Sequence, residues 1–130
     1  MSAYRVVLDT NMLVSALLSP SGNPARIYRM FLSGTLDLVV SADILAEYED
    51  VLLRPRLQLP AADVKTVFAA VRECAETVRP VISTVSLIDE DDRVFYDTAK
   101  TAGAYLITGN AKHYPEEEFI LTPTEFLALE

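Results

Sequence analysis

Acidic and amide side chains stand just beyond the predicted ends of strands in four separate parts of the sequence. They are Asp9 with Asn11, Glu47, Asp92 and Asn110. If these groups converge, their carboxylates repel one another, and a divalent cation would relieve that repulsion. Oxygen ligands without clustered His or Cys favour Mg²⁺ or Mn²⁺ over zinc. A cation of this kind suits phosphodiester hydrolysis, because it polarises the phosphoryl group and activates water.

These side chains can meet only if the strands that precede them are parallel and end at one edge of a sheet. Apolar and β-branched runs predict strands at 4–8, 36–40, 80–82, 104–108 and 119–121. Helical spacing predicts helices at 12–18, around 27–31, from the Ser41 cap to about 52, at 61–78 and at 94–102, with a last helix after the capping box at 122–125. This alternation predicts an α/β fold, namely a three-layer α/β/α sandwich with a mainly parallel central sheet of four or five strands.

The composition fits one domain over residues 1–130. The chain has 130 residues, of which 51% are hydrophobic, so it can bury a core without disulfides. Its single cysteine, Cys74, cannot form an internal bridge and is expected to pack within the helix at 61–78. No apolar run reaches the length of a membrane span, and the start of the sequence has no secretory pattern, so we expect a cytoplasmic protein without membrane contact.

The charge limits how the chain can contact nucleic acid. Eleven Lys and Arg residues stand against 19 Asp and Glu, for a net charge of −8, which argues against a broad basic face. Any such contact must be local. Arg26 with Arg29, or Arg54 with Arg56, are the pairs that could hold phosphates, although arginines of this kind are commonly only solvated.

Each candidate also has an ordinary structural interpretation. Asp9 or Asn11 is compatible with a helix N-cap, and the acidic run 89–92 is compatible with a cap plus favourable charge at a helix N-terminus. Glu47 and Glu49 lie on opposite flanks of one apolar stripe, so the helical wheel does not choose between them. What favours a functional site is the coincidence of acids beyond several strand ends.

The ordered set of motifs resembles the PIN-domain family, most closely its bacterial group of VapC-like toxins from toxin–antitoxin systems. The motifs are VLDTNMLVSA at 7–16, Ser41 leading to Glu47, DEDD at 89–92 followed by Ala99, and LITGN at 106–110. The resemblance spans nearly the whole chain. It implies a fold similar to that of structure-specific 5′ nucleases and a Mg²⁺- or Mn²⁺-dependent ribonuclease that cuts RNA. It also implies a homodimer and an antitoxin partner.

The same resemblance assigns roles to individual residues. Asp9, Glu47 and Asp92 match the family's acids that bind metal or activate water. Asn11 and Thr108 match polar residues that hold these acids or the metal-bound waters. Asn110 stands at a fourth catalytic position where many members carry Asp, so a second metal ion should bind more weakly. Asp91 or Asp89 could supply the charge that Asn110 lacks, and we expect Asp91 to act as a helper and not as a core metal ligand.

Two other functions remain open at this stage. One is a PIN-like module of weak or no activity that binds RNA or protein, which the neutral side chain of Asn110 favours. The other is a receiver-like domain that binds Mg²⁺ and signals by phosphorylation, although this requires adjacent acids after the first strand, and Asp9 is followed by Thr10. A haloacid-dehalogenase-type phosphatase would need a second Asp where Asn11 stands.

Overall fold

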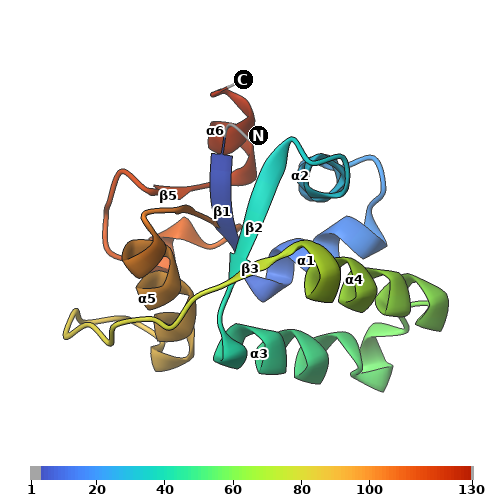
Figure 1. Ribbon diagram of the computed structural model, residues 1–130, viewed down its shortest axis with the longest axis horizontal. Helices are drawn as coiled ribbons and strands as arrows, with labels where there is room; N and C mark the ends of the chain where they lie inside the picture. Colours follow the sequence, from blue (N-terminus) through green and yellow to red (C-terminus); the bar gives the residue numbers. More distant parts are fainter. Residues whose placement is uncertain (1–3, 130) are drawn as a thin grey trace.

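The computed structural model describes residues 4–129 and shows a parallel β-sheet between layers of helices (Figure 1). Its strands are β1 (Tyr4–Leu8), β2 (Leu36–Val40), β3 (Glu76–Thr77), β4 (Tyr105–Ile107) and β5 (Ile120–Leu121). They lie in the order β3-β2-β1-β4-β5, and each neighbouring pair is parallel. The predicted α/β fold is therefore confirmed, with five strands.

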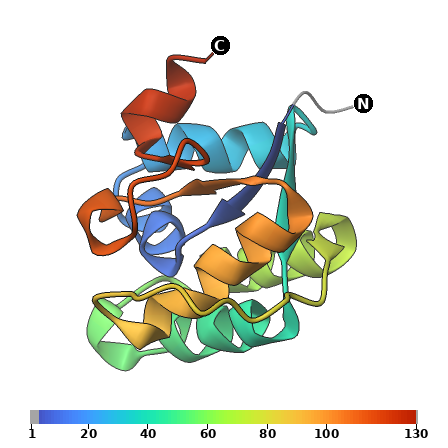
Figure 2. The ribbon, with the colours of Figure 1, turned by 90° about the vertical axis from the view of Figure 1, so that its left-hand side faces the viewer.

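The helices cover both faces of this sheet. They are α1 (Thr10–Leu18), α2 (Asn23–Leu32), α3 (Ala42–Leu52), α4 (Ala61–Cys74), α5 (Arg93–Ala102) and α6 (Pro123–Leu127), with single 3-10 turns η1 (Pro55–Leu57), η2 (Glu90–Asp92) and η3 (Ala111–His113). Helix α5 lies on one face, α1, α2 and α4 lie on the other, and α3 runs beneath the strands in the view of Figure 1 (Figures 1 and 2). Within residues 4–129, every helix is too short or too polar to span a membrane.

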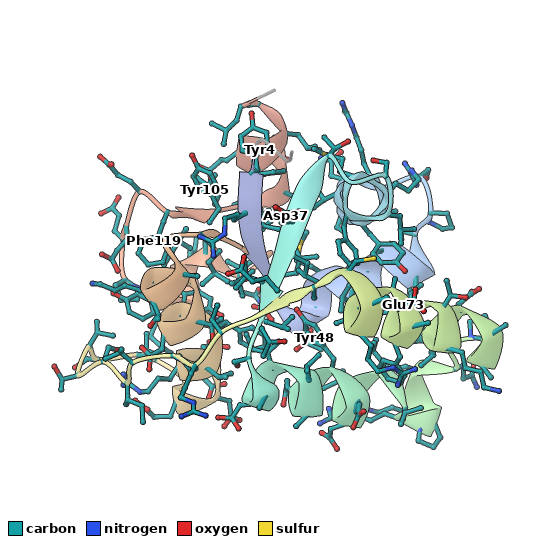
Figure 3. All side chains as sticks on the ribbon, viewed as in Figure 1. Tyr4, Asp37, Tyr48, Glu73, Tyr105 and Phe119 are labelled. Carbon is teal, nitrogen blue, oxygen red and sulfur yellow. The ribbon has the colours of Figure 1, made fainter. Side chains whose placement is uncertain are left out.

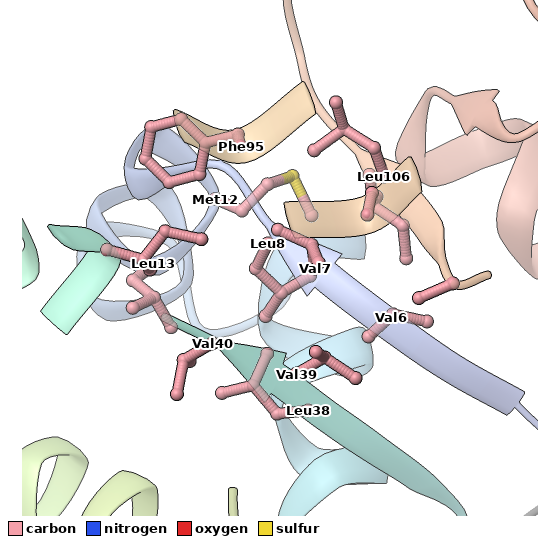
Figure 4. Packing of buried hydrophobic residues seen from close by; sticks show 14 of the residues in the cluster. Val6, Val7, Leu8, Met12, Leu13, Leu38, Val39, Val40, Phe95 and Leu106 are labelled. Carbon is pink, nitrogen blue, oxygen red and sulfur yellow. The ribbon is translucent and has the colours of Figure 1, made fainter. Parts of the chain in front are cut away.

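The core is built on the central strand. Val6, Val7 and Leu8 of β1 are each at most 1% exposed, because β2 and β4 flank this strand and helices cover both of its faces. Met12 and Phe95 pack with these residues from α1 and α5 (Figure 4). Strand β1, which precedes Asp9, is thus paired along both edges and packed on both faces.

Local signals in the sequence mark where α3 and α6 begin and where α5 ends. The hydroxyl of Ser41 accepts the backbone N–H of Ile44 at 3.2 Å and begins α3. Thr122 and Glu125 form the predicted capping box of α6. Gly103 follows α5 with φ of 65°, a left-handed conformation that glycine adopts without strain.

The segment between α4 and α5 differs from the prediction. The helix expected at 61–78 ends at Cys74, and the strand expected at 80–82 lies instead at Glu76–Thr77. Val78 donates its N–H to Val40 of β2, so the chain pairs with the sheet before it reaches Pro80. Residues 80–82 are irregular, which leaves Val81 and Ile82 exposed.

Two further sequence predictions concern this region and the ends of the chain. Cys74 is exposed as the last residue of α4, so the prediction that it packs inside that helix is wrong. The single domain over 1–130 stays a prediction, and its residues 1–3 and 130 lie outside the described part of the chain.

Candidate active site

A cleft of about 300 Å³ lies at the carboxyl end of β1. Residues from α1, α3, the turn at 54–57 and the region 89–95 line it. Its acidic side chains are Asp9, Glu47, Asp89, Asp91 and Asp92. The crossover topology thus brings acids from distant parts of the sequence to one edge of the sheet, as the position of ligand sites in parallel sheets predicts.

Asp9 is the most firmly held of these acids. It is 6% exposed and caps α1, since its Oδ1 accepts the Asn11 N–H at 3.4 Å. Its Oδ2 accepts the Thr108 hydroxyl at 2.8 Å and the Tyr114 hydroxyl at 3.4 Å. The cap interpretation of Asp9 is therefore correct, but it describes only one of the two carboxylate oxygens. Oδ2 belongs to a buried polar cluster at the ends of β1 and β4.

Helix α3 positions Glu47, and the next residue of the helix, Tyr48, supports the end of β1. Tyr48, which lies under the strands in Figure 3, donates its hydroxyl to the carbonyl of Leu8 at 2.6 Å. This bond fixes α3 against the residue that precedes Asp9. Glu47 is half-buried and lines the cleft, whereas Glu49 is exposed and lies outside it. The structure thus separates the two glutamates that the helical wheel left equivalent.

Asp92 is positioned by an irregular segment that crosses α5 before the helix begins (Figure 2). Arg93 holds this segment by donating to the Ser83 carbonyl at 2.9 Å and the Val85 carbonyl at 2.6 Å. The buried carboxylate of Asp97 accepts the Ser83 N–H at 3.2 Å. Arg93 also pairs with Glu90 in the turn η2, so the acidic run is connected to α5.

Burial and neighbouring charges raise the pKa of two acids of the cleft, Asp92 and Glu47. Desolvation, followed by the charges of Asp9 and Asp89, raises the pKa of Asp92 to about 6, which the nearby His113 partly opposes. Burial and the charge of Asp50 raise the pKa of Glu47, and Asp91 and Asp9 add to the rise. These carboxylates therefore lie close enough to destabilise one another's charged forms.

The chemistry of the cleft fits a hard divalent cation. Across residues 4–129, no three acidic, His or Cys side chains come close enough as they stand to hold an ion together. Magnesium commonly keeps several waters and takes only one or two protein carboxylates directly. A cleft in which burial and neighbouring acids raise the pKa of Asp92 and Glu47 is compatible with that mode of binding, and its acidic side chains offer only oxygen ligands.

Comparison with known proteins agrees with this arrangement. A family model described as PIN domain matches residues 5–112. This chain belongs to the PIN domain family. PIN domains are typically metal-dependent nucleases and typically use divalent metals. The chain is also similar to an uncharacterized protein of Methanocaldococcus jannaschii, at 28% identity over 109 residues, which cover 82% of this chain and 70% of the relative.

Other candidates from the sequence fall inside and outside the cleft of this PIN domain. Asn11 and Asp91 line it and are exposed, whereas Asn110 is exposed and does not line it. The backbone N–H of Asn110 donates to the Thr108 hydroxyl at 3.0 Å, and that hydroxyl in turn contacts Asp9. Asn110 is thus linked through Thr108 to Asp9, and its catalytic role stays a prediction.

Sequence reasoning missed two tyrosines that hold the first acid. Neither Tyr48 nor Tyr114 is among the site residues predicted from the sequence. Both are buried, with their hydroxyls on Leu8 and Asp9 respectively. The signal available in the sequence was weak, because a tyrosine on an apolar stripe does not reveal which buried acceptor its hydroxyl will reach.

Proposed function

We propose that this PIN domain is a metal-dependent endoribonuclease in which Asp9, Glu47 and Asp92 bind Mg²⁺ or Mn²⁺. The observation that carries the proposal is the convergence of these three acids on one cleft, where burial and then the charges of Asp9 and other neighbouring acids raise the pKa of Asp92 and Glu47. A bound cation of this kind would polarise a phosphodiester and activate water for its hydrolysis.

The residues around the acids orient them. Thr108 and Tyr114 both donate to Oδ2 of Asp9, so that oxygen already has two hydrogen bonds. Oδ1 accepts only the long 3.4 Å contact from the Asn11 N–H within the described residues. Oδ1 is therefore the atom with the most remaining capacity for a ligand. Asp91 lines the cleft and is exposed, so its carboxylate would accept hydrogen bonds from water at the edge of the cleft.

The proposal predicts that Asp9→Asn and Asp92→Asn each abolish RNA cleavage in Mg²⁺ or Mn²⁺. The loss should be about 100-fold or more, because each change removes a charged oxygen from the proposed cation site. Cleavage of a labelled single-stranded RNA measures it, and circular dichroism checks the fold. Glu49→Gln, a comparable change on the exposed flank of α3, should cleave like the parent.

If both variants cut RNA at the rate of the parent, the assignment of these acids is wrong. Calorimetric titration with Mn²⁺ separates the main alternative, a PIN fold that binds RNA or protein without catalysis. Such a module would give no heat of Mn²⁺ binding and no cleavage while still binding RNA. The neutral Asn110 is the residue that favours it, but the structure shows Asn110 outside the cleft lining.

A narrower proposal concerns the biological role. The likeness of the ordered motifs to VapC-like toxins supports a toxin that an antitoxin protein inhibits and that acts as a homodimer. An inhibitor would need to fill the acidic cleft or block the approach of RNA to it.

A further inference from the structure

Only one of the two arginine pairs lies at the acidic cleft. Arg54 and Arg56, on either side of Pro55, both line it. Arg26 and Arg29 lie on α2 and are absent from its lining, and Arg29 donates to the Pro20 carbonyl at 2.9 Å. The structure therefore chooses between two pairs that the sequence left open.

Arg54 is committed to neighbouring acids. Its guanidinium forms an ion pair with Asp50 at 2.8 Å, one helical turn earlier. Burial and the Asp50 charge raise the pKa of Glu47, and the positive charge of Arg54 opposes that rise. Arg54 thus compensates charge at the base of the cleft, and its donors are partly used.

Arg56 is exposed, and its guanidinium makes no hydrogen bond or ion pair with any residue of the range 4–129. This is unusual for a cation that shares a cleft with five carboxylates. Its backbone is nevertheless well defined. The Leu57 N–H donates to Arg54 at 3.1 Å, and the Gln58 N–H donates to Pro55 at 3.0 Å.

The end of this turn carries backbone strain. Gln58 adopts a left-handed conformation with φ of 51° and is the one residue other than glycine with positive φ in the described chain. Such a conformation persists only where the surrounding structure enforces it. The turn therefore holds Arg56 at the cleft while leaving its side chain without a protein partner.

We propose that Arg56 binds the RNA backbone, donating to the phosphate next to the one that is cut. The inference rests on the proposed nuclease function. A guanidinium presents planar paired donors that match two phosphate oxygens, and it stays charged at any physiological pH. In a protein of net charge −8, an unpaired cation beside the catalytic acids offers the local attraction that RNA needs.

The test compares Arg56→Ala with Arg26→Ala, which removes the same charge from an exposed arginine outside the cleft. A labelled single-stranded RNA of mixed sequence is the probe. Its anisotropy is measured in an Asp9→Asn background, which we expect to leave the RNA intact, over a range of salt concentrations. Steady-state cleavage by the otherwise unchanged protein gives KM and kcat in parallel.

We expect Arg56→Ala to weaken RNA binding about tenfold and to lower the slope of log affinity against log salt by about 0.7, the value for one lost phosphate contact on a single strand. KM should rise about tenfold, with kcat changed less than about threefold. Arg56→Lys should keep the salt slope of the parent, because it retains the charge. Arg26→Ala should match the parent throughout.

Equal binding and an equal salt slope for Arg56→Ala and the parent would overturn the inference, as would an equal loss in Arg26→Ala. The proposed function fails separately. If the parent binds RNA through Arg56 without cutting it, the proposed nuclease function is wrong and the Arg56 contact stands. If the parent cuts RNA and this does not depend on Arg56, only the proposed contact is wrong. A parent that does neither overturns both.

Discussion

At the scale of single residues, the most informative group in the cleft is the carboxyl of Asp92. Its side chain is 18% exposed, and His113 approaches it no closer than 3.9 Å. Desolvation and the neighbouring acids raise its pKa to about 6, whereas an Asp in an unfolded chain has a pKa of about 3.9. Ionisation of Asp92 therefore makes the folded protein less stable when no metal is bound.

The sign of the resulting pH dependence follows from proton binding. Between about pH 4 and about pH 6 the folded state binds more protons at Asp92 than the unfolded state, so this group's contribution to stability falls as the pH rises through that window. The cost is fully present above about pH 6. Allowing for solvent screening, it amounts to roughly 2 kcal/mol.

Asp92→Asn should therefore raise Tm by a few degrees at pH 7.5 in EDTA and leave it unchanged at pH 4. Thermal unfolding across pH 4–8 measures the difference. The control Glu49→Gln should follow the parent at every pH, because this glutamate is exposed outside the cleft. A destabilised Asp92→Asn protein at pH 7.5 would contradict the electrostatic account.

At the scale of elements, the segment between β3 and α5 depends on Arg93. This side chain donates to two backbone carbonyls and to the Ser83 hydroxyl at 3.0 Å, and it pairs with Glu90. Glu90 is 69% exposed, so its pair with Arg93 contributes little. The bonds to the partly buried carbonyls matter more, because those acceptors lose their partner if the guanidinium is removed.

Arg93→Met should lower the free energy of unfolding by about 1–2 kcal/mol and increase amide hydrogen exchange over residues 83–92. RNA cleavage should fall as well, because this segment leads into Asp92. The matched control is Arg79→Met, which alters an exposed arginine of the same segment whose side chain makes no hydrogen bond or ion pair within residues 4–129. Unchanged exchange in Arg93→Met would show that the segment holds its position without this side chain.

Element boundaries were predictable where local chemistry decides them and not elsewhere. Strand β1, strand β2 and the caps at Ser41 and Thr122 follow from β-branched runs and side-chain acceptors within a few residues. The end of α4 does not, because β3 consists of two exposed residues that pair with Val39 and Val40 from a distant part of the chain. A strand of two residues has no detectable periodicity, so the strand was predicted at residues 80–82, which are more apolar.

The candidate site divides in the same way. Asp9 follows β1, Glu47 lies within α3 and Asp92 precedes α5, and the sequence reveals all three of these elements. Parallel-sheet topology therefore sufficed to bring the three acids together. The side chains that hold them were beyond reach, since the bond from Tyr114 to Asp9 spans 105 positions and depends on the path of an irregular loop. The sequence likewise could not show that Arg56, and not Arg26, lies at the cleft.

At the scale of the whole molecule, the proposed toxin role concerns the cellular RNA that the protein would cut and the antitoxin that would inhibit it. If the narrower proposal holds, expression of this chain should arrest growth of a bacterial host, while the Asp9→Asn protein should not. Co-expression of a short neighbouring gene should restore growth. Colony counts and analytical ultracentrifugation of the purified proteins measure the effect and the expected homodimer. Unimpaired growth alongside active RNA cleavage in extracts would argue for a nuclease with another role.

The two ends of the described chain meet on the side remote from the cleft. Tyr4, at the start of β1, donates its hydroxyl to the carbonyl of Leu129 at 3.2 Å, whereas Asp9 follows the opposite end of that strand. Any reporter, surface tether or neighbouring module joined at either end would therefore emerge behind the acidic opening and leave the approach to it clear. The same proximity would allow the ends to be linked and new ones opened in a loop, without disturbing the route by which a nucleic-acid strand enters.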